Sequence, residues 1–136
     1  MTLFTPARID AAYLKMALMG FQGSGKTFTA AETGIGLVLH MRELGLPDAD
    51  KPLAFADTEK GSDWILPRVH KAGLQMITAK TRAFSDLLAL VDEAERTASV
   101  LLIDSLTHFW VELTDAYMRA KKRTRLQFED WSFLKT

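Results

Sequence analysis

The chain has no cysteine, no long apolar run and no excess of charge of either sign. Without cysteine, disulfides and thiolate metal sites are excluded. The 136 residues carry 17 Lys+Arg and 17 Asp+Glu, so no global field attracts nucleic acid or anionic lipid, and any such contact needs a local patch. No run approaches the ~20 apolar residues that span a bilayer, and the first ten residues lack a signal-peptide core. These absences predict a soluble cytoplasmic protein.

The most informative stretch runs from Gly20 to Thr27 and reads Gly-Phe-Gln-Gly-Ser-Gly-Lys-Thr. It fits the phosphate-binding pattern G-x-x-x-x-G-K-[ST], or P-loop, without substitution. A short apolar run at 13–19 precedes it, and residues 26–44 follow with apolar side chains at helical spacing. Strand, glycine loop and helix is the order that a P-loop requires. We therefore predict a nucleotide site here; the alternative is a glycine-rich turn that happens to contain a lysine.

The residue types of the loop account for phosphate binding. Its glycines allow the backbone to approach phosphate oxygens closely, and its amides form an anion site at the positive end of the helix dipole. Lys26 is expected to reach the β- and γ-phosphates and so to act in catalysis as well as binding, and the Thr27 hydroxyl is expected to ligate Mg²⁺. The residues predicted to bind nucleotide are Gly20, Gly23, Ser24, Gly25, Lys26, Thr27 and Phe28.

Buried apolar runs alternate with helical patterns along the chain, which predicts an α/β fold with a mainly parallel sheet and helices on both faces. The length fits a single domain of residues 1–136. The expected strands are 13–19, 52–56, 74–79 and 99–104. The expected helices are 26–44, Ser62 or Asp63 to 72, one capped by Ser85 or Asp86, and 107–122. The remaining parts are a lead-in at 1–11, a loop at 45–52 and a tail at 123–136.

Acidic residues end two of the expected strands. The apolar run that begins at Val100 ends at Asp104, and ligands of open α/β sheets bind at this carboxyl edge. Asp104 is therefore expected to hold Mg²⁺. Because Ser105 follows it, the group that activates the attacking water must lie elsewhere. We predict Glu59 as that group and Asp57 as structural; the alternative is that both acids only cap the following turn.

Two short segments resemble a known family pattern. Phe55-Ala-Asp-Thr-Glu59 and Leu102-Ile-Asp-Ser105 look like the corresponding segments of RecA-like ATPases. Residues 104–110 and 122–131 more closely resemble the phage and prophage AAA-type ATPases found near single-strand annealing proteins. The resemblance covers nearly the whole chain.

This resemblance implies a RecA-like P-loop NTPase fold and Mg²⁺-dependent ATP hydrolysis linked to DNA recombination or replication. Matched position by position, it gives nucleotide and metal binding to Lys26 and Thr27. It gives metal binding to Asp104 and catalysis to Glu59.

One feature departs from the family pattern. RecA-like sheets place a strand from later in the sequence between the P-loop strand and the strand that ends in the metal-binding aspartate. Nothing after Asp104 reads as a buried strand. We therefore expect a C-terminally incomplete form of a longer domain. The alternative is an unusual sheet in which 13–19 and 99–104 pair directly.

The tail carries a cluster of cations followed by the aromatic residues Phe128, Trp131 and Phe133. One interpretation is a solvated helix end that complements the helix dipole, with a tail that docks on the core. The other is a patch for single-stranded DNA, in which the aromatics stack on bases, or an arginine finger for a neighbour in a homo-oligomer. The cations are Arg119, Lys121, Lys122, Arg123 and Arg125.

Two other functions fit a P-loop. A small-molecule kinase would need an acceptor pocket, which the sequence does not indicate. A non-enzymatic nucleotide-binding module that controls a partner would leave Glu59 purely structural. His108 lies one helical turn after Asp104 and serves either the helix start or γ-phosphate sensing.

Overall fold

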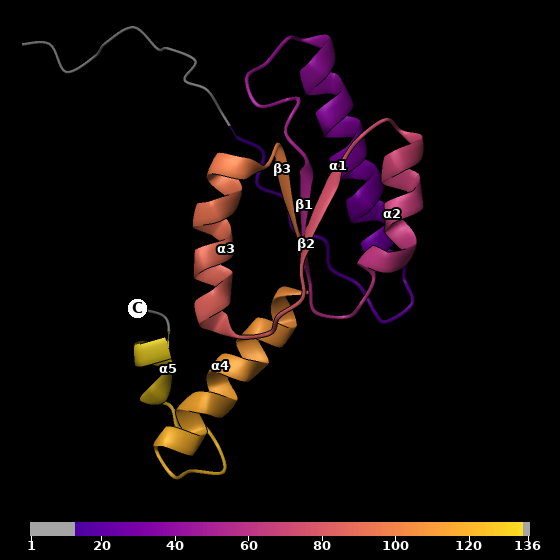
Figure 1. The fold of residues 1–136 in the computed structure, drawn as a ribbon. Coiled ribbons are helices and arrows are strands. Elements are labelled where there is room, and N and C mark those ends of the chain that lie inside the picture. The colour runs from indigo at the N-terminus through magenta and orange to yellow at the C-terminus, as the bar shows by residue number, and fades with distance from the viewer. Residues whose placement is uncertain (1–12, 135–136) are drawn as a thin grey trace, which may run out of the picture.

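The computed structural model describes residues 13–134, which form an α/β fold (Figure 1). In chain order the elements are α1 Lys26–Glu43, β1 Leu53–Asp57, α2 Ser62–Lys71, β2 Met76–Ala79, α3 Phe84–Thr97, β3 Val100–Asp104, α4 Leu106–Ala120 and α5 Asp130–Leu134. The helices predicted at 26–44, at 62 or 63 to 72 and at 107–122 are confirmed as α1, α2 and α4, with bounds that differ by one or two residues.

The sheet is parallel and has the strand order β2-β1-β3. Helices α1 and α2 cover one face, and α3 covers the other (Figure 1). The main core lies under α1 and α2 and consists of Ala31, Ile35, Val38, Leu53, Phe55, Ile65, Val69 and Leu74. In the register of β1 with β3, Asp57 lies beside Asp104 at the carboxyl edge. The predicted α/β class with helices on both faces is confirmed.

The strand predicted at 13–19 is wrong. Residues 13–19 form no regular secondary structure, and Met19 is 94% exposed. Within residues 13–134, β3 pairs with β1 only, so the direct pairing of 13–19 with 99–104 is not found either. An apolar run indicates that a segment tends to be buried, but a strand also needs a neighbour that accepts its backbone hydrogen bonds. This segment has no such neighbour in the described structure.

The cap predicted for α3 is also wrong. The helix begins at Phe84, with Ala83 at the N-cap position, so Ser85 and Asp86 lie inside the first turn. Thr81 performs the local capping instead, because its hydroxyl accepts the Ala83 N–H at 3.2 Å and donates to the Asp86 carboxylate at 2.5 Å. The sequence offered several polar residues in succession, and only the backbone path decided among them.

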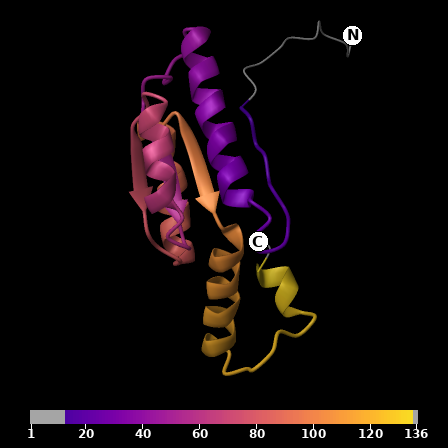
Figure 2. The same ribbon diagram turned by 90° about the vertical axis from the view of Figure 1, so that its right-hand side faces the viewer.

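Helix α4 projects beyond the carboxyl edge of the sheet, and the tail folds back so that α5 lies beside it (Figure 2). Trp110 of α4 and Trp131 of α5 stack with ring centroids 6.3 Å apart. Asp130 is 4% exposed and accepts hydrogen bonds from Arg123 at 2.8 Å and from the Tyr117 hydroxyl at 3.0 Å. The tail therefore docks onto α4 through one aromatic stack and one buried carboxylate.

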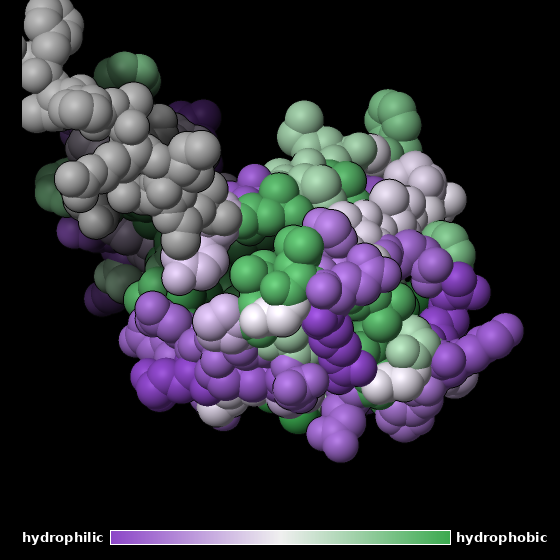
Figure 3. Space-filling model, turned by 90° about the horizontal axis from the view of Figure 1, so that it is seen from above, coloured by the Kyte–Doolittle hydropathy of each residue, from purple (hydrophilic) through white to green (hydrophobic). Residues whose placement is uncertain are grey.

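The amino edge of the sheet lies opposite α4. Seen from this end, hydrophilic side chains dominate the lower part of the view, and hydrophobic ones are exposed across its centre and along its upper margin (Figure 3). Leu44 and Leu46, in the turn that follows α1, are both exposed. Between residues 13 and 134, none of the helices is both long and apolar enough to cross a lipid bilayer.

Two glycines of α1 provide a matched test of its packing. Gly34 is buried, and a Cβ there would lie 3.2 Å from Leu53 and 3.3 Å from Leu102, whereas a Cβ at Gly36 would meet nothing within 4 Å. Gly36→Ala is expected to raise the free energy of unfolding by about 1 kcal/mol, the usual propensity gain in a helix. Gly34→Ala should not show this increase, because the added methyl group would crowd Leu53 and Leu102. Urea denaturation measures both variants, and equal gains would contradict this account.

Candidate nucleotide site

The glycine loop before α1 needs glycine at two positions. Gly23 and Gly25 have φ angles of 78° and 82°, in the left-handed region that other residues rarely adopt. At Gly20, an added Cβ would lie 2.6 Å from the Ser24 hydroxyl oxygen. Gly25 forms the N-cap of α1, so the loop leads directly into the positive end of that helix. The backbone thus has the conformation that the motif predicts.

The Lys26 side chain folds back over this loop. Its ammonium group donates hydrogen bonds to the carbonyl oxygens of Gly20 and Phe21, both at 2.9 Å. None of the ion pairs found among residues 13–134 involves Lys26. Its positive charge is therefore held at the loop by neutral acceptors and remains available to an anion.

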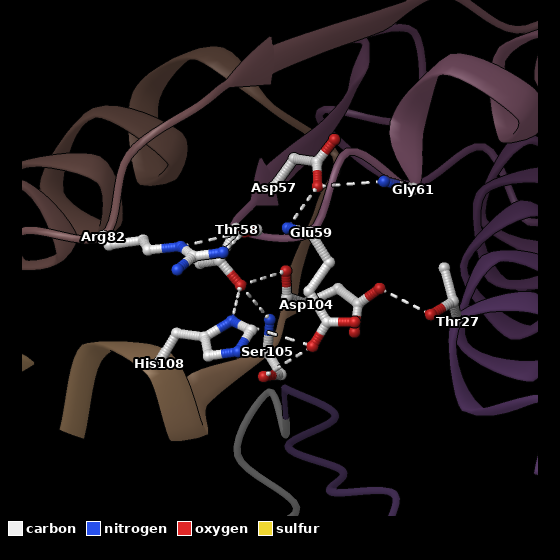
Figure 4. Close-up of polar contacts among 9 residues, drawn as sticks. All are labelled: Thr27, Asp57, Thr58, Glu59, Gly61, Arg82, Asp104, Ser105 and His108. Carbon is white, nitrogen blue, oxygen red and sulfur yellow. Dashed lines mark hydrogen bonds and ion pairs between the residues drawn. The ribbon is translucent and has the colours of Figure 1, made fainter. Parts of the chain in front are cut away.

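The loop meets the end of β3 through a pair of oxygen atoms. The Thr27 hydroxyl donates to the Asp104 carboxylate at 2.5 Å, although the two residues lie 77 positions apart in sequence (Figure 4). Gly61, after β1, packs against both, because a Cβ there would lie 3.1 Å from the Thr27 methyl and 3.4 Å from an Asp104 oxygen. The two residues predicted to ligate Mg²⁺ are thus brought together.

Glu59 reaches the same edge of the sheet from the loop after β1. The Ser105 hydroxyl donates to Glu59 Oε1 at 3.3 Å, and His108 Nδ1 lies 3.7 Å from the same oxygen (Figure 4). The Glu59 side chain is 50% exposed. Because Ser105 directly follows Asp104, the two predicted carboxylates lie on one rim of the sheet.

Asp57 has a structural role, as expected. It is 2% exposed and accepts the backbone N–H groups of Glu59, Gly61 and Ser62 at 3.0–3.1 Å, together with the Ser62 hydroxyl. Burial by itself would raise the pKa of Asp57, but the hydrogen bonds from Ser62, Glu59 and Gly61 outweigh it and hold the pKa below its ordinary value. This carboxylate fixes the loop that carries Glu59.

Thr58 joins the elements around the site, a role that no sequence pattern predicted. Its backbone N–H and its hydroxyl both lie within hydrogen-bond distance of the Asp104 carbonyl oxygen, at 2.8 and 2.9 Å. The same hydroxyl accepts the Ser105 N–H at 2.8 Å and lies 2.6 Å from His108 Nδ1. Arg82 donates two hydrogen bonds to the Thr58 carbonyl. The only sequence signal was a threonine between two strand-end acids.

Phe28 follows Thr27 in the first turn of α1. Its ring lies under the guanidinium group of Arg68, 4.7 Å from the centroid, and Arg68 forms an ion pair with Glu32 at 2.5 Å. The Phe28 side chain is 42% exposed and contacts Arg68 of α2. Its contact with nucleotide stays a prediction.

The donors at the loop suit a hard cation that keeps other ligands. Thr27 and Asp104 supply oxygen atoms side by side, and no group of three or more His, Cys, Asp or Glu that could hold a metal occurs among residues 13–134. Mg²⁺ is commonly held by one or two protein oxygens together with substrate phosphates and water. The residues present fit an ion of that kind.

A family model described as an AAA domain matches residues 12–136. The chain belongs to this AAA domain family. The matched range includes the P-loop, the ends of β1 and β3 and the whole of α4. The family is one of AAA-type P-loop ATPases, so membership indicates a nucleotide-binding function. No curated protein and no solved structure matches the chain.

Proposed function

We propose that this AAA domain binds ATP with Mg²⁺ and hydrolyses it in DNA recombination or replication of the phage type. The observation that carries the hydrolytic part is the contact of Thr27 with Asp104, with Glu59 on the same rim. The proximity of a P-loop hydroxyl to a strand-end carboxylate, with a second acid on the same rim, supports this proposal. The resemblance of residues 104–110 and 122–131 to phage AAA-type ATPases supports the DNA context.

Thr27 and Asp104 are the residues that would hold Mg²⁺. When bound, the ion neutralises charge on the phosphates. Lys26 adds a fixed positive charge at the loop, and the amides at the start of α1 supply further donors. These groups explain binding of a triphosphate, and the remaining chemistry is the activation of water.

Glu59 is the proposed acceptor of the proton from water. Its Oε1 atom receives the Ser105 hydroxyl, whereas its Oε2 atom has no hydrogen-bond partner in the described part of the chain. The side chain is half exposed, so water reaches it. A carboxylate with one oxygen anchored and the other open to water is suited to general base catalysis.

Basal hydrolysis is expected to be slow. Arg82 contacts the loop after β1, but its guanidinium donates two hydrogen bonds to the Thr58 carbonyl. An additional positive charge for the transition state would then have to come from a second copy of the chain, as an arginine finger. We therefore expect turnover to depend on assembly or on DNA.

The proposed DNA contact lies at the far end of α4 (Figure 2). Arg123 is engaged by Asp130, so it is excluded from the predicted set. Arg119, Lys122 and Arg125 form no ion pair or hydrogen bond through their side chains within residues 13–134, and the nearby Phe128 ring is 92% exposed. Free cations beside an exposed aromatic ring suit a phosphate backbone with unstacked bases.

ATP turnover with single-stranded DNA tests this function. Phosphate release should rise on addition of single-stranded DNA. In the double variant Lys122→Glu with Arg125→Glu, this stimulation should fall roughly tenfold at low salt while basal turnover stays unchanged, because phosphate contacts dominate such binding. The matched control reverses two exposed cations elsewhere, Lys71→Glu with Arg96→Glu.

Each other outcome identifies a different function. Transfer of the γ-phosphate to a small acceptor would indicate a kinase. ATP affinity without any turnover would indicate a nucleotide-binding module. Turnover that single-stranded DNA does not change would remove the DNA part of the proposal and leave an ATPase.

A further inference from the structure

We infer that His108 is a positioning residue that holds Glu59 in its working orientation. The inference rests on the proposed function, in which Glu59 activates water. His108 lies in the first turn of α4, and its Nδ1 atom is 2.6 Å from Thr58 Oγ1 and 3.7 Å from Glu59 Oε1. One ring nitrogen thus faces two consecutive residues of the loop after β1 (Figure 4).

The hydrogen-bond capacity of Thr58 indicates which atom carries the proton. A hydroxyl has one donor and two acceptor positions. Thr58 Oγ1 accepts the Ser105 N–H and donates to the Asp104 carbonyl oxygen, which has no proton to give. Its remaining position is an acceptor, so His108 Nδ1 must carry the hydrogen that points there. An Nδ1–H in this place also presents a positive dipole to the Glu59 carboxylate.

Glu59 needs such support because little else holds it. Its carboxylate has one hydrogen bond, a long one of 3.3 Å from Ser105, and its side chain is half exposed. A glutamate held this loosely loses little rotamer freedom and spends time away from any single position. Ser105 and His108 both belong to the start of α4, so this one turn of helix controls where the carboxylate lies.

A purely structural role for His108 makes different predictions. If the ring only fastened α4 to Thr58, its removal would lower stability and would affect ATP binding and turnover together. If it positions Glu59, its removal lowers kcat at nearly constant KM, because the geometry of the reacting atoms changes while the phosphate-binding loop does not. The contact of Thr27 with Asp104 does not involve His108.

The test compares His108→Leu with His108→Asn in the full chain. Leucine removes the Nδ1–H and favours helix, whereas asparagine keeps an N–H donor near the same place. We expect His108→Leu to lower kcat for ATP roughly 10- to 100-fold with KM within about twofold. His108→Asn should recover most of the rate. His70→Leu, at an exposed position of α2, is the matched control and should leave both constants unchanged.

A double-mutant cycle with Glu59→Gln completes the experiment. If His108 acts through Glu59, His108→Leu has almost no further effect once Glu59 is glutamine. Equal fold losses in both backgrounds, or a loss that asparagine does not recover, would overturn the inference. If the wild-type chain hydrolyses ATP and His108→Leu does so at the same rate, only the inference about His108 is overturned. If the wild-type chain binds ATP but does not hydrolyse it, the proposed hydrolysis is overturned as well. Ser105→Ala is a second variant of the same contact and should lower kcat in the same direction.

Discussion

Glu59→Gln is expected to lower the rate of ATP hydrolysis by about 10²- to 10⁴-fold, the usual contribution of a general base. Glutamine keeps the shape of the side chain and an oxygen that accepts the Ser105 hydroxyl. It cannot take a proton from water at neutral pH. ATP affinity should stay within about twofold of wild type, because the P-loop and Asp104 do not change. Phosphate release and titration calorimetry measure the two quantities separately.

Asp104→Asn is the contrasting variant. It should weaken Mg²⁺-dependent ATP binding, because asparagine retains the geometry beside the Thr27 hydroxyl but removes the charge that attracts the cation. Unchanged dependence on Mg²⁺ would remove Asp104 from the metal site. A Glu59→Gln chain that hydrolyses ATP at the wild-type rate would show that the acid is structural. The structure already argues that Glu59 is not a turn cap, because Asp57 caps the turn after β1.

Asp57→Asn is expected to lower the free energy of unfolding by about 2–4 kcal/mol at pH 7. Asp57 accepts three backbone N–H groups and one hydroxyl in a buried position. The NH₂ group of asparagine would replace one carboxylate oxygen and would face N–H or O–H groups, which need an acceptor. Each buried group left without a partner costs about 1–3 kcal/mol. Urea denaturation measures the loss. Asp92→Asn, at an exposed position of α3, is the control and should change stability by less than about 0.5 kcal/mol.

The same variant gives a dependence on pH with a definite sign. Because the pKa of Asp57 is lowered in the folded state, its charged form contributes stability above its ordinary pKa. That contribution is lost as the pH falls below about 4 toward the folded-state pKa. Asparagine mimics the protonated acid at every pH, so the difference between wild type and Asp57→Asn should shrink over this range. A difference that stays constant down to pH 3 would contradict the assignment.

Local patterns predicted much of the candidate site. The P-loop carries its own conformation because Gly23 and Gly25 adopt positive φ angles and Lys26 begins a helix. Asp104 and Glu59 were predicted as site residues because parallel strands deliver their carboxyl ends to one edge. These features depend on residues close together in sequence, or on one general property of parallel sheets. The catalytic role of Glu59 stays a prediction.

Contacts between distant segments were not predicted from the sequence. Thr58 touches both Asp104 and His108, and no periodicity or motif pairs the loop after β1 with the end of β3 or the start of α4. The engagement of Arg123 by Asp130 likewise removed one cation from a cluster that looked uniform in sequence. A cation in a run of charges is exposed or engaged according to the fold around it, which composition does not record.

The sequence by itself determined that this chain has a phosphate-binding loop, an α/β arrangement and acids at two strand ends, because glycine conformation, apolar periodicity and strand direction are local properties. Only the tertiary structure decided that residues 13–19 form no strand and that the Asp57 carboxylate is buried and hydrogen-bonded to the loop that follows it. It also decided that Ser105 and His108, at the start of α4, lie beside the Glu59 carboxylate. The physical reason is that a hydrogen bond needs a partner in space, and the partners here come from segments that the chain brings together only on folding.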